Sequence, residues 1–274
     1  MSRKHPMRAV LTSIAVCGFL MATQLQSEAQ TSPQYSVAIR PASTITSRGV
    51  AAIDSAAHSG KHLFIFLWKA DDEQSRSMFG VFQSTMKKWT ESADSIELQI
   101  TDPNEKPLVD RFGLSRAPMP MVLALAPNGA VTKGFPIKFD EKQLREGFVS
   151  PCTAKCLKAL QERKLVLVCI QNERTQFAQA AMNATLAFKA DARFEKATEI
   201  VVLNPEDRAE GTFLRDLKVD PRSPQAVTII LAPPGQPVAS FVGSLTKEQI
   251  VAKIQAGPCA DGKCGPNGCC PPKK

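Results

Sequence analysis

Two short apolar segments decide how this chain folds: LFIFLWKA at residues 63–70 and LVLVCIQN at residues 165–172. Each has the length and the continuous apolar character of a β-strand that is buried on both faces of a sheet. Each also follows a segment with helical character and precedes a polar stretch. Because the two segments lie 102 residues apart, the sequence predicts that one structural unit occurs twice.

Other features repeat along the chain. The dipeptides DP at 102–103 and NP at 204–205 are again 102 residues apart, whereas LAPNG at 125–129 recurs as LAPPG at 231–235, 106 residues further on. The change of offset predicts one four-residue loop insertion in the second copy. Two copies of about 100 residues have the size of self-sufficient domains, so we interpret them as a tandem duplication rather than a solenoid.

Each copy has the pattern helix, strand, helix, strand, helix, strand, strand, helix. In each copy four apolar residues recur at helical spacing and are interpreted as core packing: Met78, Phe82, Met86 and Trp89, and Phe177, Ala181, Ala184 and Phe188. The first of these helices is expected to begin near Asp72. The turn sequences PNG and PPG lie between adjacent apolar runs and predict a closing hairpin. The sequence therefore predicts an α/β fold with two mixed sheets, each flanked by helices.

This order of elements resembles a thioredoxin-like domain. Trp68, near the end of the first strand, resembles the thioredoxin tryptophan, and APMP at 117–120 resembles the loop that carries the cis-proline of that fold. Pro120 stands at the cis-proline position, and Ala226 stands at the equivalent point of the second copy. The resemblance implies that Pro120 belongs to a peptide-binding site.

The resemblance covers roughly residues 48–256 and implies two tandem thioredoxin-like domains, at 48–150 and 151–256. Thioredoxin-like reductases carry Cys-x-x-Cys just beyond the first long strand, where a helix N-terminus lowers the pKa of the nucleophilic thiol. Here the two windows read DDEQS at 71–75 and ERTQF at 173–177, without sulfur. Their carboxylates suit helix capping instead. We therefore predict no catalytic residues; an enzymatic alternative would be a thiol-disulfide oxidoreductase.

Two cysteines, Cys152 and Cys156, lie where the first copy passes into the second. At this spacing the two sulfurs share one face of a helix, which suits a soft metal such as Cu(I) better than a disulfide. A helical turn loosened at Pro151 would permit a local disulfide, so disulfide, metal site and plain thiols all stay open. Cys169 lies within an apolar strand and is expected to be a buried, inert thiol.

The last segment, residues 257–274, is rich in Gly and Pro and contains four cysteines: Cys259, Cys264, Cys269 and Cys270. It is not expected to form a regular element. Small disulfide loops, a flexible thiolate site for copper or zinc, and intermolecular linkage are the alternatives. If a metal is bound, these four cysteines together with Cys152 and Cys156 are the predicted ligands; no other cofactor is predicted.

The N-terminal segment has the pattern of an export signal. Three basic residues precede an apolar stretch at 9–22, and Ser27-Glu28-Ala29 offers small residues to a signal peptidase. We predict a signal peptide at 1–29, cleaved after Ala29, and a linker at 30–47. The apolar stretch is shorter than the roughly 20 residues that span a bilayer, so no membrane span is expected after cleavage. The mature chain is predicted to be secreted or periplasmic, where disulfides persist.

Composition narrows the classes of function. With 43% hydrophobic and 22% charged residues the chain is neither fibrous nor wholly disordered. Its net charge of +8 is scattered, without a run of five like charges, so nucleic acid is not an expected partner. The leading hypothesis is an exported, non-catalytic binding, scaffold or chaperone-like protein that holds exported proteins or peptides near Pro120. The alternative is a copper- or zinc-handling or thiol-disulfide exchange protein that uses its cysteines outside the cores.

Overall fold

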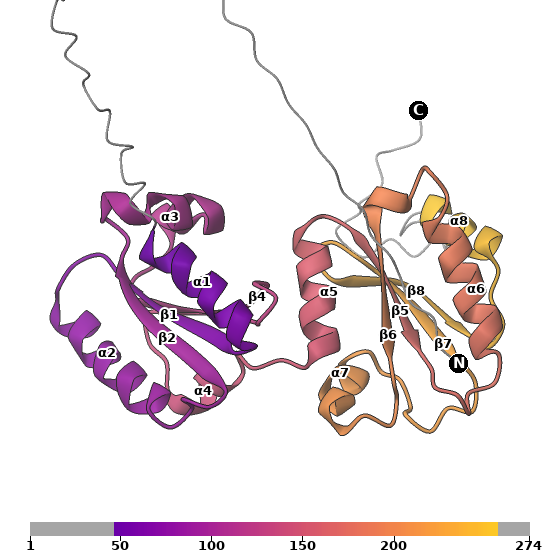
Figure 1. Ribbon diagram of the computed structural model, residues 1–274, viewed down its shortest axis with the longest axis horizontal. Coiled ribbons are helices and arrows are strands. Elements are labelled where there is room, and N and C mark those ends of the chain that lie inside the picture. Colours follow the sequence, from indigo (N-terminus) through magenta and orange to yellow (C-terminus); the bar gives the residue numbers. More distant parts are fainter. Residues whose placement is uncertain (1–46, 257–274) are drawn as a thin grey trace, which may run out of the picture. The chain divides into compact units, whose positions relative to one another are not determined.

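The computed structural model describes residues 47–256, which form two α/β domains (Figure 1). The predicted signal peptide, the linker up to residue 46 and the cysteine-rich tail at 257–274 lie outside the described residues. Within residues 47–256 no helix is both long enough and apolar enough to cross a membrane.

Both domains have the predicted order of elements. Domain 1 contains α1 (Arg48–Ser59), β1 (His62–Trp68), α2 (Glu73–Met86), β2 (Ala93–Gln99), α3 (Lys106–Phe112), β3 (Met121–Leu125), β4 (Val131–Pro136) and α4 (Glu141–Arg145). Domain 2 contains α5 (Pro151–Gln161), β5 (Leu165–Ile170), α6 (Ala178–Lys189), β6 (Thr198–Leu203), α7 (Gly211–Asp216), β7 (Val227–Ala232), β8 (Gln236–Val242) and α8 (Lys247–Ala256). Short 3₁₀ turns, η1 (Pro103–Glu105) and η4 (Arg208–Glu210), precede α3 and α7.

Each domain is built on one mixed sheet, as predicted. The strand order is β2-β1-β3-β4 in domain 1 and β6-β5-β7-β8 in domain 2. The first two strands of each domain are parallel, and the third strand, β3 or β7, pairs antiparallel both with the central strand and with the last strand, β4 or β8. A parallel pair needs a crossover connection, and α2 and α6 supply it.

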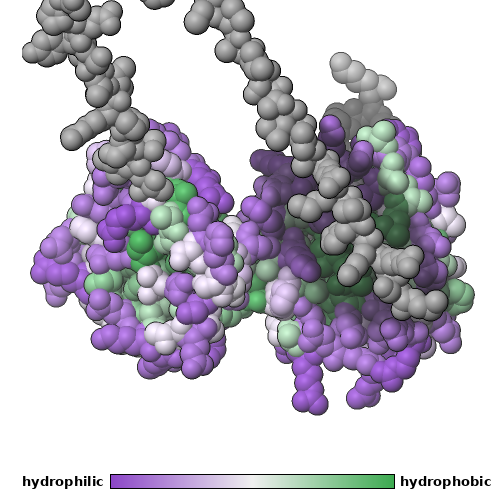
Figure 2. Space-filling model, in the orientation of Figure 1, coloured by the Kyte–Doolittle hydropathy of each residue, from purple (hydrophilic) through white to green (hydrophobic). Residues whose placement is uncertain are grey.

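Helices cover both faces of each sheet. In domain 1, Leu63, Ile65 and Leu67 of β1 pack with α1 and α3, whereas Phe64 and Phe66 pack with α2 and α4. Domain 2 has the same division, with α5 and α7 on one face and α6 and α8 on the other. Burial on both faces explains why the central strands are continuously apolar. Hydrophilic side chains cover most of the face visible in Figure 2.

The register of the repeat differs from the predicted one at the first strand. Leu67 pairs with Met121, and Ile170 pairs with Val227. Met121 and Val227 each begin the third strand of their sheet and are 106 residues apart, as predicted for that region. Leu67 is therefore equivalent to Ile170, an offset of 103 rather than 102. A continuous apolar run has no alternation to set its register, which is why the sequence placed it one residue off.

The offset between equivalent residues of the two domains is larger still at the second strand. Asp94 of β2 pairs with Leu63, and Glu199 of β6 pairs with Val166, so these strands are offset by 105 residues. The prediction of a single four-residue insertion is wrong. Domain 2 gains two residues between its first and second strands and one more before its third strand.

A buried carboxylate closes the N-terminus of the first helix in domain 1. Glu105 is 2% exposed and accepts hydrogen bonds from Ser47 Oγ (2.6 Å), Arg48 N (2.9 Å) and Gly49 N (3.1 Å). The first N–H groups of a helix have no partner within the helix, and its dipole favours a negative charge there. Glu105 thereby connects α1 to the turn η1, although the two are far apart in sequence.

Domain 2 repeats this arrangement. Glu210 is 2% exposed and accepts hydrogen bonds from Ser150 Oγ (2.5 Å) and Cys152 N (2.9 Å) at the start of α5. The two carboxylates end the sequences D-x-x-E at 102–105 and 207–210. The offset of 102 assigned to the DP and NP dipeptides concealed this match, because it paired Asp102 with Asn204 instead of Asp207.

Replacement of Glu105 by Gln should destabilise domain 1 by about 2 kcal/mol, because charge-assisted bonds at a buried helix end become weaker neutral ones. Both tryptophans of the chain, Trp68 and Trp89, lie in domain 1, so urea unfolding followed by tryptophan fluorescence reports on this domain alone. Glu91→Gln removes the same charge at an exposed turn and should leave the midpoint unchanged. Equal midpoints for the two variants would contradict the role assigned to Glu105.

Candidate functional site

The end of β1 in domain 1 leads into the window at 71–75, where thioredoxin-like reductases carry Cys-x-x-Cys. Asp72 caps α2, and its Oδ1 accepts a hydrogen bond from Ser75 N at 2.7 Å. This bond holds the pKa of Asp72 below its ordinary value. The helix begins at Glu73, as predicted, and the carboxylate of Asp72 serves as a helix cap.

The loop before β3 lies beside this window, because Leu67 pairs with Met121. The Met119–Pro120 peptide bond is cis, as the resemblance implied. Pro120 is buried, and its carbonyl oxygen accepts a hydrogen bond from Ile137 N at 2.6 Å. The N–H and C=O of Met119 have no backbone hydrogen-bond partner among residues 47–256. Met119 thus offers a short backbone edge to which an extended segment could pair.

In domain 2 the residue equivalent to Met119 is Gln225, whose C=O and N–H bond to Ser223 Oγ (2.9 and 3.4 Å), and the backbone groups on either side of Gln225 are used by the chain itself. Gln176 forms a parallel bridge with Gln225: Gln176 N donates to Pro224 O at 2.8 Å, and Ala226 N donates to Gln176 O at 2.9 Å. Pro120 stands in domain 1 where Ala226 stands in domain 2. Because proline has no N–H, this bridge cannot form in domain 1.

The bridge also changes how α6 begins. α6 starts at Ala178, and Phe177 precedes it with a left-handed φ of 62°. Phe177 is 48% exposed, so its predicted place in the core is wrong. The extended backbone at Gln176 keeps Phe177 outside the helix and turns its side chain toward solvent. The other three residues of that stripe, Ala181, Ala184 and Phe188, are buried as predicted.

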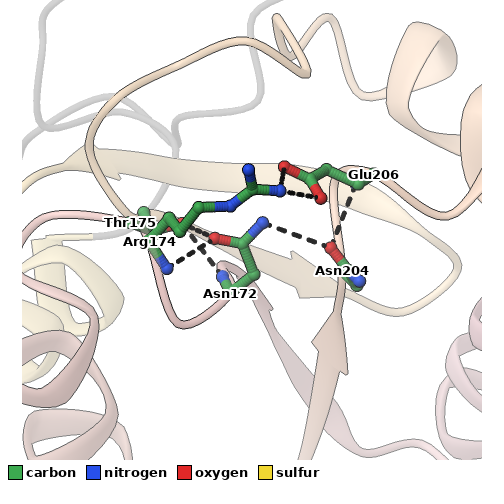
Figure 3. A network of polar contacts seen from close by, with 5 residues as sticks. All are labelled: Asn172, Arg174, Thr175, Asn204 and Glu206. Carbon is green, nitrogen blue, oxygen red and sulfur yellow. Dashed lines mark hydrogen bonds and ion pairs between the residues drawn. The ribbon is translucent and has the colours of Figure 1, made fainter.

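Figure 3 shows how polar contacts hold the window of domain 2. Asn172 Oδ1 accepts from Arg174 N (3.0 Å) and Thr175 Oγ1 (2.9 Å). Arg174 reaches across to Glu206, and Asn204 Oδ1 accepts from Glu206 N at 3.1 Å. These contacts connect the end of β5 to the loop after β6. The arginine of this window is therefore paired with a carboxylate of the loop after β6.

Of the comparisons with known proteins, the one with solved structures gave matches. No protein-family model and no curated protein matches the sequence. The first two thioredoxin domains of Saccharomyces cerevisiae Eps1p match with 10% identity and a TM-score of 0.28, over 75% of this chain and 95% of that one. Thioredoxin O2 from Arabidopsis thaliana matches with 12% identity and a TM-score of 0.30, over 35% and 80%.

The order and directions of the strands, rather than these low scores, define the architecture. Both domains have a thioredoxin-like fold. Neither thioredoxin-like domain carries a cysteine in the window after its first strand.

The helical cysteine pair occupies packing positions of the second thioredoxin-like domain. With the offset of 103, Cys152 is equivalent to Gly49 and Cys156 to Ile53, a core residue of α1. Cys156 is 2% exposed within the core, and Cys152 is half-buried with its Sγ 3.5 Å from Val202 O. Neither forms a disulfide with another cysteine of residues 47–256. Their i, i+4 spacing therefore follows from the inner face of α5.

The surroundings of these two thiols oppose ionisation. Burial, together with the nearby carboxylate of Glu210, raises the pKa of Cys152 to about 11, and burial raises the pKa of Cys156 to about 12. Burial also raises the pKa of Cys169, which lies fully inside domain 2 as predicted. Nucleophilic attack and metal coordination both require the thiolate, so neither is favoured at neutral pH.

A metal site remains a prediction for the cysteines of the tail. Within residues 47–256 no three His, Cys, Asp or Glu side chains lie close enough together to bind one ion. Cys259, Cys264, Cys269 and Cys270 lie outside the described residues. Binding of copper or zinc by these four, with or without Cys152 and Cys156, stays an expectation from the sequence.

We expect iodoacetamide to alkylate Cys152 about 20-fold more slowly at pH 7 than a cysteine in an unstructured peptide, because a thiol of pKa about 11 is almost wholly protonated there. Cys156 should react more slowly still. Timed alkylation of the reduced protein, followed by peptide mass spectrometry, measures both rates. The rate at Cys152 should keep rising beyond pH 9; a plateau below pH 8 would contradict the raised pKa.

Proposed function

We propose that this chain is an exported, non-catalytic protein of two tandem thioredoxin-like domains that binds extended polypeptide segments through domain 1. The observation that carries the proposal is the unpaired backbone of Met119, beside Pro120 and at the end of β1. A segment that forms main-chain hydrogen bonds there is held by its backbone rather than by its sequence.

Two observations support a role in binding rather than thiol catalysis. The window at the start of α2 contains a capping carboxylate and the buried Ser75, and the equivalent window of domain 2 contains the paired residues of Figure 3. The thiols of domain 2 have pKa values raised by burial, which opposes thiolate chemistry.

The two domains would then have different roles. In domain 2 the backbone of Gln176 already uses the hydrogen-bonding groups of Pro224 and Ala226. The N–H and C=O of Gln225, which are equivalent to those of Met119, already bond to Ser223 Oγ, so a segment that paired there would have to displace these two hydrogen bonds. We therefore assign polypeptide binding to domain 1 and a scaffold role to domain 2.

The proposed location follows from the sequence. Residues 1–29 have the basic, apolar and small-residue pattern of a cleaved signal peptide. The partners proposed for domain 1 are accordingly exported polypeptides with unpaired, extended backbone.

Binding can be tested with a permanently unfolded polypeptide, reduced and carbamidomethylated, carrying a fluorescent label whose anisotropy is measured. Met119→Asp places a charge at the half-buried backbone edge and should weaken binding about tenfold or more, because the charge must be desolvated. Ser115→Asp adds the same charge at an exposed position nearby and is the matched control. The same affinity in both variants would exclude Met119 as the binding edge.

Catalysis can be tested with disulfide reduction of insulin by dithiothreitol. The mature chain should not raise the rate above that without protein, because both windows after the first strands lack sulfur. Robust turnover that Cys152→Ser abolishes would refute the non-catalytic role and assign a redox function to α5.

A further inference from the structure

We infer that domain 1 carries a binding pocket for a guanidinium group on an aliphatic chain, such as an arginine side chain. The pocket has a volume of about 330 Å³ and lies between α2 and the ends of β1 and β2. Its lining includes Phe66, Trp68, Phe79, Glu97, Asp71 and Arg76. This volume is at the lower end of small-molecule sites and suits one long side chain.

Aromatic rings form the apolar part of the pocket. Phe66 is 1% exposed, and its ring centroid lies 5.1 Å from that of Phe79. Trp68 follows on the same face of β1, and both Trp68 and Phe79 are half-buried. Such rings attract cations and pack against aliphatic chains.

Glu97 supplies an unpaired negative charge. It is in register with Phe66 on the neighbouring strand, so its side chain faces α2, and it is half-buried. Its carboxylate has no hydrogen bond or ion pair with any other residue in 47–256. A carboxylate that faces the pocket without a partner can accept charge-assisted hydrogen bonds from a bound cation.

The arginine that already lines the pocket does not pair with Glu97. Arg76 Nε lies 3.0 Å from Asp71 Oδ1, and its guanidinium also donates to Asp71 O at 3.2 Å. With Asp71 and Arg76 neutralising each other, the charged residues of the lining have a formal charge of −1, which belongs to Glu97.

A guanidinium fits these surroundings better than an ammonium. It is planar, stacks on aromatic faces, is weakly hydrated, and can donate two parallel hydrogen bonds to one carboxylate. A second hollow of about 320 Å³ shares Phe79 and Glu97 with the pocket and is also lined by Phe82, Met86 and Ile96. An aliphatic chain attached to the guanidinium can lie along those apolar side chains.

The pocket is particular to domain 1 and is not required by the fold. The positions equivalent to Phe66, Trp68 and Glu97 are Cys169, Gln171 and Val202 in domain 2. Buried groups that the fold needs, such as Glu105 and Glu210, are present in both copies. The inference also stands apart from polypeptide binding at Met119, because it concerns a side-chain pocket on the α2 face.

The test uses the full chain labelled with ¹⁵N and titrated with N-acetyl-arginine methylamide. The chain has two tryptophans, so its NMR spectrum has two indole N–H signals, which Trp89→Phe assigns. The indole N–H of Trp68 is buried and has no partner among the described residues, whereas Trp89 does not line the pocket. The Trp68 signal should shift to saturation while the Trp89 signal stays in place.

Two matched controls decide the outcome. N-acetyl-citrulline methylamide has the same shape without the charge, and it should bind at least tenfold more weakly. Glu97→Gln should weaken binding of the arginine probe at least tenfold, whereas Glu91→Gln should leave it within twofold; unchanged urea midpoints would show that both variants are folded. The inference would be overturned if the Trp68 signal did not move, if the citrulline probe bound as tightly as the arginine probe, or if Glu97→Gln bound the arginine probe as tightly as the unaltered chain.

The source of the guanidinium is distinguished by a pentapeptide with arginine between alanines. Binding at least tenfold tighter than the single-residue probe would support the pocket and identify a polypeptide as its ligand. Equal binding would support the pocket and identify the side chain alone as sufficient.

Discussion

The carboxylate buried at the start of the first helix is the interaction on which each domain depends. In domain 1 Glu105 accepts three hydrogen bonds from Ser47, Arg48 and Gly49, and it joins helix α1 to the turn before α3. Both helices lie on the same face of the sheet, so this contact sets how they cover the central strand. Glu210 does the same for α5 and α7. A charged group can be this deeply buried only because helix N–H groups and a hydroxyl surround it.

The loops before the third strands of the two domains differ by one backbone N–H group. Ala226 donates the N–H that closes the bridge to Gln176, whereas Pro120 at the equivalent place has none. The same fold therefore has this bridge in domain 2 and lacks it in domain 1, where the N–H and C=O of Met119 have no backbone partner among residues 47–256. The difference arises from proline chemistry rather than from a rearrangement of the sheet.

The described cysteines illustrate how spacing can imitate a site. Cys152 and Cys156 have the separation of a chelating pair, yet they stand at the positions of Gly49 and Ile53 on the inward face of a helix. An i, i+4 pattern arises equally from core packing, because the same helical periodicity selects residues for burial. Burial then raises their pKa values, which makes these thiols less suited to redox or metal chemistry than exposed ones.

Local pattern determined much about this protein: the duplication, the order of elements and the mixed sheets could be read from apolar runs and turn residues, and the resemblance to a thioredoxin-like domain implied the cis-proline at Pro120. Local pattern could not predict four features: the strand register, the exposure of Phe177, the bridge at Gln176 and the pocket at Glu97. Each of these depends on residues that are far apart in the chain. Hydrophobic periodicity records which side of an element is buried, but it does not record which partner lies opposite. Only the tertiary structure decides that, since hydrogen bonds and charge pairs form between specific atoms brought together by packing.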